Sequence, residues 1–219
     1  SEAIQAIENN ISAGKRMLML AMATGTGKTF TAVAMVYRLL KSGLAKRVLF
    51  LVDRRALAAQ AAVAFNSFET PSRYKLSKEY EIYSQRFQSE DFEESDKFDV
   101  SVLPNSHLTK PDPAKSFIYI CTTQRMAMNL FGRENSFIQG DDPDIDDEAV
   151  RLEIANNAFD VIIADECHRG YTPRDEGIWR ATINHFDAIK IGLTATPAAH
   201  TPAIFGQPVS RYSFEQGVL

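Results

Sequence analysis

The sequence predicts an α/β domain with a mostly parallel sheet and helices on both of its faces. Short apolar runs recur along the chain, each long enough for a strand, and patterns typical of amphipathic helices alternate with them. The runs occupy residues 17–22, 48–52, 117–121, 161–164 and 189–193. Strands that are apolar on both faces and alternate with helices are typical of a parallel sheet that is covered on both sides.

The helices are predicted from the spacing of their apolar residues. The segment 28–41 follows the first apolar run and ends near Gly43, and the alanine-rich segment 55–65 follows the second run. The segment 2–13 precedes the first run. One face of this first helix carries Ala3, Ile4, Ile7 and Ile11.

Two stretches interrupt the alternation. Residues 66–116 are polar and charged, and we interpret them as an insertion with one short strand near 80–83. Residues 132–147 are acidic and irregular, and we expect a helix after them that reaches about residue 157. With these insertions, the length of 219 residues fits one large domain.

Composition excludes some classes of protein. Two cysteines, Cys121 and Cys167, are too few for a disulfide framework, so we interpret them as buried thiols of a cytoplasmic protein. No apolar run has the length of a membrane span, and no membrane partner is expected. The net charge is −4, so a nucleic-acid partner would need a local basic patch.

A glycine-rich loop lies between the first apolar run and the helix at 28–41. Its glycines let backbone N–H groups turn toward phosphate oxygens, and the start of the helix adds a partial positive charge. Lys28 would neutralise the β- and γ-phosphates of a nucleoside triphosphate, and the Thr29 hydroxyl would ligate Mg²⁺. The residues predicted to bind the nucleotide are Thr24, Gly25, Thr26, Gly27, Lys28 and Thr29.

One position departs from the general phosphate-loop pattern, because Met22 stands where a glycine is usual. The alternative interpretation is a glycine-containing turn that carries a lone lysine.

Two carboxylates follow the apolar run at 161–164. Asp165 and Glu166 come at its carboxyl end, and in a parallel sheet such ends face the same crevice as the phosphate loop. One carboxylate would hold Mg²⁺ while its neighbour activates water for hydrolysis of the γ-phosphate. The alternative is a strand end capped by solvated acids.

Other polar positions allow weaker interpretations. Thr194 and Thr196 follow the run at 189–193, and they either sense the acidic pair or form a turn before proline. The acidic stretch at 142–147 superficially has calcium-loop spacing but lacks the required glycine. Cys167 and His168 are adjacent, which is not the spacing of a zinc chelate. Trp179 is expected to pack within a helix.

Three motifs in order, ATGTGKT, DECH and TATP, resemble motifs I, II and III of superfamily 2 helicases and translocases. In that superfamily the loop often lacks the leading glycine, which accounts for Met22. The resemblance implies the first RecA-like domain of such a motor, a P-loop NTPase fold. Residues 50–60 resemble motif Ia, and residues 121–125 resemble the next motif that contacts nucleic acid.

The chain resembles one branch in particular, the motor (R) subunit of type I restriction enzymes. The residues that carry this likeness lie at 165–170, 192–201, 205–209 and 212–213. The resemblance implies ATP-driven translocation on double-stranded DNA, with Lys28 on the phosphates, Asp165 on Mg²⁺ and Glu166 on the water. It also implies that Thr194, Thr196 and His168 couple the nucleotide state to contact with DNA. Contacts with the DNA backbone are assigned to Arg54, Arg55, Thr123 and Gln124. For the two arginines, a solvated helix start is the alternative.

The resemblance also implies parts that the sequence does not contain. Motors of this family have a second RecA-like domain that supplies arginine fingers, a nuclease domain, and partner subunits for methylation and specificity. We therefore expect a fragment that alone binds nucleotide weakly and hydrolyses it poorly. The alternatives are another superfamily 2 DNA or RNA helicase, which would not share the 198–212 segment, and a nucleotide-binding assembly module that does not hydrolyse.

Overall fold

The computed structural model describes residues 2–22, 27–92, 101–135, 149–165, 173–195 and 205–212. The strands are β1 Met17–Met22, β2 Arg47–Val52, β3 Glu81–Ser84, β4 Ser101–Val102, β5 Phe117–Thr122, β6 Val161–Asp165, β7 Ile189–Thr194 and β8 Ser210–Tyr212. The helices are α1 Glu2–Ser12, α2 Lys28–Lys41, α3 Arg55–Ser67, α4 Leu76–Glu79, α5 Ser106–Thr109, α6 Thr123–Phe131 and α7 Pro173–Asn184.

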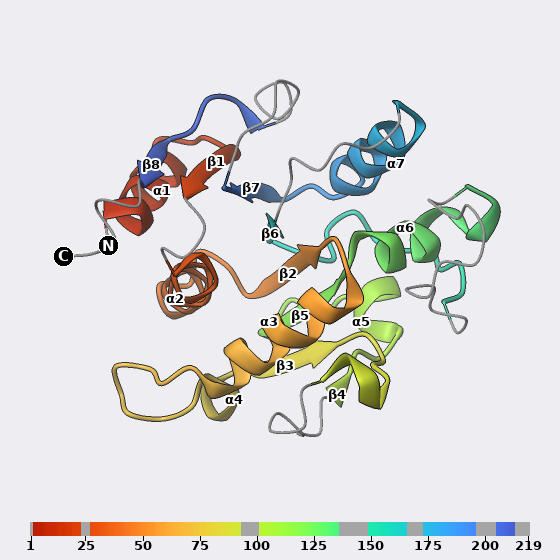
Figure 1. Ribbon diagram of the computed structural model, residues 1–219, viewed down its shortest axis with the longest axis horizontal. Coiled ribbons are helices and arrows are strands. Elements are labelled where there is room, and N and C mark those ends of the chain that lie inside the picture. Colours follow the sequence, from red (N-terminus) through yellow and green to blue (C-terminus); the bar gives the residue numbers. More distant parts are fainter. Residues whose placement is uncertain are drawn as a thin grey trace.

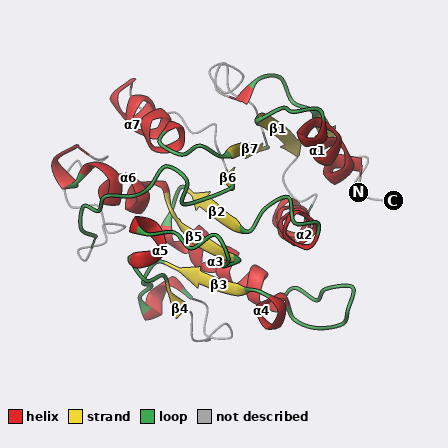
Figure 2. Cartoon of the chain, turned by 180° about the vertical axis from the view of Figure 1, so that it is seen from behind, coloured by secondary structure: helices red, strands yellow, loops and turns green. Residues whose placement is uncertain are grey.

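The described strands form one sheet in the order β4-β3-β5-β2-β6-β7-β1-β8 (Figure 1). Every pairing between them is parallel. Helices α1 to α4 cover one face and α5 to α7 the other, as the opposite view also shows (Figure 2). The predicted fold class is confirmed.

Alternation along each central strand divides the core into two layers. In β2, Val48, Phe50 and Val52 pack under α2 and α3, whereas Leu49 and Leu51 face the layer of α6 and α7. Successive side chains of a strand point to opposite faces, so a strand that is covered on both sides is apolar on both. All six residues of β2 are buried, and its one polar side chain, Arg47 at the start, bonds to Asp160.

The segment that we interpreted as an insertion supplies one end of the sheet. The short strand expected near residue 80 is present as β3, which pairs with β5 from Glu81 opposite Phe117. A second strand, β4, pairs with β3 and was not expected. It has only two residues, which are too few to give a periodic pattern in the sequence. The strand β8 was missed for the same reason, since it has only three residues.

The helix expected to reach residue 157 is wrong, because residues 149–157 contain no helix. Their backbone instead bonds to distant parts of the chain. The Leu152 N–H donates to the Asn129 carbonyl at 2.7 Å, and the Ala155 N–H donates to the Leu108 carbonyl at 3.1 Å. Ile154 is buried in the layer of α6 and α7, so its burial favours this path over local helix bonds.

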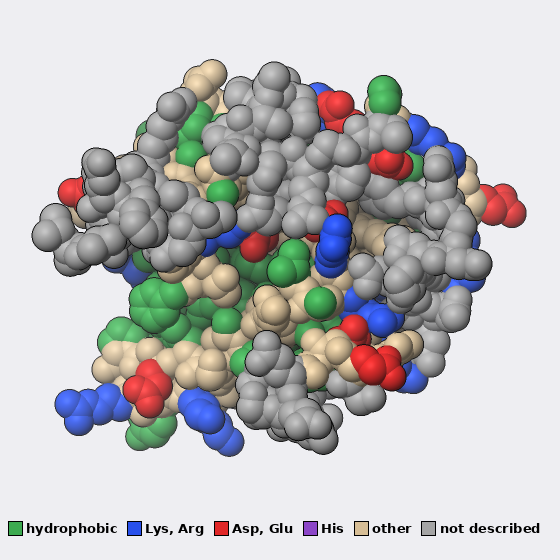
Figure 3. Space-filling view, viewed as in Figure 1, with side chains coloured by type: hydrophobic (Ala, Val, Ile, Leu, Met, Phe, Trp, Pro, Cys, Tyr) green, Lys and Arg blue, Asp and Glu red, His purple; other side chains and the backbone are tan. Residues whose placement is uncertain are grey.

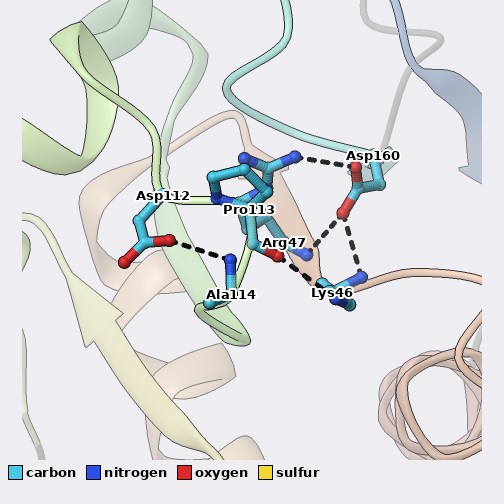
Figure 4. A network of polar contacts seen from close by, with 6 residues as sticks. All are labelled: Lys46, Arg47, Asp112, Pro113, Ala114 and Asp160. Carbon is cyan, nitrogen blue, oxygen red and sulfur yellow. Dashed lines mark hydrogen bonds and ion pairs between the residues drawn. The ribbon is translucent and has the colours of Figure 1, made fainter.

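A partly buried polar network fixes the amino end of β6 against β2 (Figure 4). The Asp160 carboxylate accepts the backbone N–H groups of Lys46 and Arg47 at 2.9 and 2.8 Å. It also accepts a bond from the Arg47 guanidinium at 3.1 Å. Burial alone would raise the pKa of Asp160, but the bonds from Arg47 and Lys46 outweigh it and hold the pKa below its ordinary value of 3.8.

Asp160→Asn should therefore lower the free energy of unfolding at pH 7 by about 1 to 2 kcal/mol. A lowered pKa in the folded state gives stability that is present above the unfolded pKa and is lost as the pH falls through the folded pKa. The difference between wild type and variant should thus shrink on acidification below pH 3.8. Urea unfolding at neutral and acid pH measures it.

Asp187→Asn is the matched control, because Asp187 is 70% exposed and pairs with Arg16 on the surface. Its effect should stay within about 0.5 kcal/mol. If Asp160→Asn lowered the free energy of unfolding equally at both pH values, the stabilisation would not come from the charged form of Asp160.

Candidate nucleotide site

The predicted site residues follow neighbouring strands at one edge of the sheet. Thr123 comes after β5, Arg54 after β2, Asp165 ends β6 and Thr194 ends β7. Lys28 begins the helix that comes after β1. The order β5-β2-β6-β7-β1 therefore brings residues that are far apart in the sequence to a single carboxyl edge. In open parallel sheets, ligands bind at such an edge.

The phosphate loop is described from Gly27 onward, and Thr24, Gly25 and Thr26 lie outside the described residues. Gly27 has a φ of 77°, in the left-handed region that favours glycine. It is the residue before α2, and its carbonyl accepts the Thr31 N–H at 2.8 Å. The first N–H groups of a helix have no partner within the helix, so α2 directs donors toward the loop.

The Lys28 ammonium lies 3.0 Å from Oδ1 of Asp165. The side chains are only 15% and 16% exposed, so their attraction is screened less than on an open surface. Lys28 follows β1 and Asp165 ends β6, with β7 between the two strands. The predicted phosphate ligand and the predicted metal ligand therefore converge on one point.

The donors at this point fit Mg²⁺, which prefers oxygen ligands. Asp165 offers a carboxylate beside Lys28, which is predicted to bind phosphate, and the exposed Thr29 offers a hydroxyl in the first turn of α2. Glu166, the predicted base, lies outside the described residues. Its role stays a prediction.

The coupling residues are described only in part. Thr194 is fully buried at the end of β7, opposite Ala21 of β1. On the other side of β7, the neighbouring Leu193 is opposite Asp165. Thr194 thus lies between the strand of the phosphate loop and the strand of the acidic pair. His168 and Thr196 lie outside the described residues, and coupling stays a prediction.

The two arginines after β2 differ in their surroundings. The Arg54 side chain is 65% exposed, with Nε 3.8 Å from an Asp53 carboxylate oxygen. Arg55 is buried, and its Nε donates to Oδ1 of Asp91 at 2.8 Å. The solvated helix start that we considered is therefore wrong for Arg55, and contact of either arginine with the DNA backbone stays a prediction. Asp91 was not predicted, because nothing in the sequence shows that residue 91 folds back onto α3.

Thr123 and Gln124 open helix α6. The Thr123 hydroxyl is buried and donates to the Val52 carbonyl at 3.4 Å, which ties α6 to the end of β2. Gln124 is half-buried. The buried Gln85 accepts the Thr122 N–H at 2.7 Å, a positioning contact that the sequence did not suggest. Contacts of Thr123 and Gln124 with DNA stay predictions.

Other expectations concern residues away from this edge. Trp179 packs in α7 with 4% exposure, as expected. Cys121 is a buried free thiol, and burial raises its pKa to about 12. Cys167 and the acidic residues at 142–147 lie outside the described residues. Among the described helices, none is both long and apolar enough to cross a membrane.

Comparison with known proteins shows which family the chain belongs to. The family described as "Type III restriction enzyme, res subunit" matches residues 1–199. The chain belongs to this family. The nucleotide motifs and the strands that carry them lie within the matched residues, so this res-type domain is the helicase-like part of a restriction-enzyme subunit.

The res-type domain is similar along nearly its whole length to two curated relatives from Escherichia coli. It is 36% identical to the type I restriction enzyme EcoKI endonuclease subunit of strain K12, over 233 aligned positions and 100% of this chain. It is 32% identical to the type I restriction enzyme EcoAI endonuclease subunit, over 98% of this chain. These relatives confirm the resemblance to type I subunits. The chain spans only 16% and 22% of their lengths.

Solved structures share the fold. The ATP-dependent type ISP restriction-modification enzyme LlaBIII bound to DNA superposes with a TM-score of 0.60 and 20% identity, over 99% of this chain and 15% of its own. The Hef helicase domain of Pyrococcus furiosus superposes with a TM-score of 0.53 and 18% identity, over 96% of this chain and 37% of its own. At sequence identities of 20% and 18%, these superpositions show a shared fold alone.

Proposed function

We propose that this domain binds ATP with Mg²⁺ at the carboxyl edge and drives translocation on double-stranded DNA. One observation carries the proposal: the Lys28 ammonium, at the start of the helix that comes after β1, and the Asp165 carboxylate, at the end of β6, meet at 3.0 Å. A cation for phosphate and a carboxylate for a divalent ion are the two charges that phosphoryl transfer requires in one place.

The chemistry follows from the positions of the side chains. The first N–H groups of α2 and the Lys28 ammonium bind the phosphates of ATP. Thr29 and Asp165 would hold Mg²⁺, which would offset phosphate charge. Glu166 takes a proton from the water that attacks the γ-phosphorus, and ADP leaves with the electrons of the broken P–O bond. The order β1, β7, β6 along the edge supports this division of roles.

Contact with DNA occupies the next strands of the same edge. β2 is the neighbour of β6, and the exposed Arg54 comes shortly after β2 ends. β5 is the next strand, and Thr123 and Gln124 come directly after it. The face seen in Figure 3 mixes basic and acidic side chains, so such a contact is local rather than a broad basic surface. Thr194, Thr196 and His168 lie in motifs that would transmit the nucleotide state to these strands.

The remaining parts of the motor belong to the proposal as well. The relatives are several times longer than this chain, which leaves length for a second RecA-like domain with an arginine finger and for a nuclease domain. The type I names of these relatives support partner subunits for methylation and specificity in a cytoplasmic restriction complex.

In the full-length protein, duplex DNA should stimulate ATP hydrolysis, and Arg54→Gln should reduce that stimulation. The variant removes one phosphate contact, so its DNA affinity should fall about equally on unrelated duplexes. The slope of log affinity against log salt should also flatten by about 0.9. Fluorescence anisotropy across a salt series measures both.

Arg73→Gln is the matched control, because Arg73 is exposed in the turn before α4, outside the motifs. A rate of ATP hydrolysis that does not change when DNA is added would contradict the proposed translocase activity. Nucleotide binding without any hydrolysis would favour an assembly module. A sequence-selective loss in Arg54→Gln would remove Arg54 from the DNA backbone.

A further inference from the structure

Lysines gather at the amino edge of the sheet, opposite the edge that carries the nucleotide residues. Lys15, Lys46 and Lys115 lie in the loops that enter β1, β2 and β5, and Lys190 is the second residue of β7. The strand order β5-β2-β6-β7-β1 places these four lysines, which we call the amino-edge row, one after another along the edge. Four strand spacings of about 4.8 Å give the row a length of about 19 Å.

The carboxylates at this edge are already bound. Asp187 pairs with Arg16 at 2.6 Å, and Asp160 pairs with Arg47 at 3.1 Å. Asp112 accepts the Ala114 N–H of its own loop at 2.8 Å (Figure 4). From β5 to β1, this edge carries four lysines, two arginines and these three carboxylates, so its formal charge is +3. The whole chain has a net charge of −4. Glu81 on β3 lies beyond this row.

None of the four lysines forms an ion pair with a described carboxylate. Lys46 donates to a neutral group, the Pro113 carbonyl, at 3.2 Å (Figure 4). Burial lowers the pKa of Lys190, and the neighbouring Arg16 lowers it further against a smaller opposite effect of Asp187. The formal charge of this edge is positive, so an anion beside it would be stabilised.

We propose that the amino-edge row binds the phosphate backbone of duplex DNA, as a second contact remote from the nucleotide edge. A row of point charges along one edge of a sheet is complementary to a linear polyanion. Its length of about 19 Å corresponds to five or six base pairs at about 3.4 Å each. Lysine contacts to phosphates fix position and carry no sequence information. The inference rests on DNA as the partner proposed above.

The experiment compares two double variants of the protein, using a fluorescently labelled duplex of arbitrary sequence. Lys15→Gln with Lys115→Gln removes the two ends of the row. Lys75→Gln with Lys78→Gln removes two equally exposed lysines near α4, with the same change in net charge. The first variant should flatten the slope of log affinity against log salt by about 1.8, since each lost phosphate contact contributes about 0.9. The control should leave the slope unchanged.

ATP binding and the melting temperature should stay at wild-type values in both double variants, since these lysines are exposed and far from the nucleotide edge. An equal change in slope for the two double variants would mean a general charge effect and would overturn the proposal. If the slope of log affinity against log salt flattened in Arg54→Gln but not in the Lys15/Lys115 double variant, only the proposed DNA contact of the amino-edge row would be overturned. Absence of DNA binding by the wild-type protein would instead overturn DNA as the partner.

Discussion

Lys28→Ala should abolish measurable binding of ATP with Mg²⁺ while the fold stays intact. The ammonium would make charge-assisted bonds to the β- and γ-phosphates, each worth about 1.5 to 3 kcal/mol. Together they correspond to a loss of affinity of about 10² to 10⁴. Titration calorimetry or a fluorescent ATP analogue measures it.

Lys41→Ala is the matched control within the same helix. Lys41 is the last residue of α2, is 58% exposed and pairs with Glu79 at 3.6 Å, so it shares the helix but not the site. It should bind ATP as the wild type does. Equal affinity in Lys28→Ala would contradict the phosphate-loop assignment, and a lowered melting temperature would show that Lys28 supports the fold instead.

The sequence predicted the central strands well, because burial on both faces leaves an unbroken apolar run. β2 and β5, each with six buried residues, are examples. The strands β4 and β8 could not be predicted, because two or three residues give no periodicity. The helix expected to reach residue 157 failed for another reason, since hydrogen bonds to distant carbonyls of Leu108 and Asn129 override local propensity.

The site could be predicted as a set of strand ends but not as a geometry. Parallel strands bring their carboxyl ends to one edge, so Lys28 and Asp165 were expected to be near each other. The position of β7 between β1 and β6 depends on strand order, which the sequence does not contain. The partner of Arg55 is a tertiary contact with Asp91 and was equally hidden.

In the full-length protein, Glu166→Gln should preserve ATP binding and lose DNA-stimulated turnover. Glutamine keeps the size of the side chain and its hydrogen bonding but cannot take a proton from water. Loss of one general base typically lowers the rate by about 10² to 10⁴. Steady-state ATPase assays with saturating duplex DNA, together with ATP affinities, separate the effect on kcat from the effect on binding.

Asp165→Asn tests whether the two neighbouring carboxylates have different roles. Asp165 meets Lys28 at 3.0 Å, so its charge belongs to the binding site as well as to the reaction. The asparagine variant should therefore weaken binding of ATP with Mg²⁺ as well as turnover, whereas Glu166→Gln should lower turnover alone. Near-normal turnover in Glu166→Gln would mean that another group activates the water. Equal losses of binding in both variants would mean that the carboxylates act as one unit, as when both bind Mg²⁺.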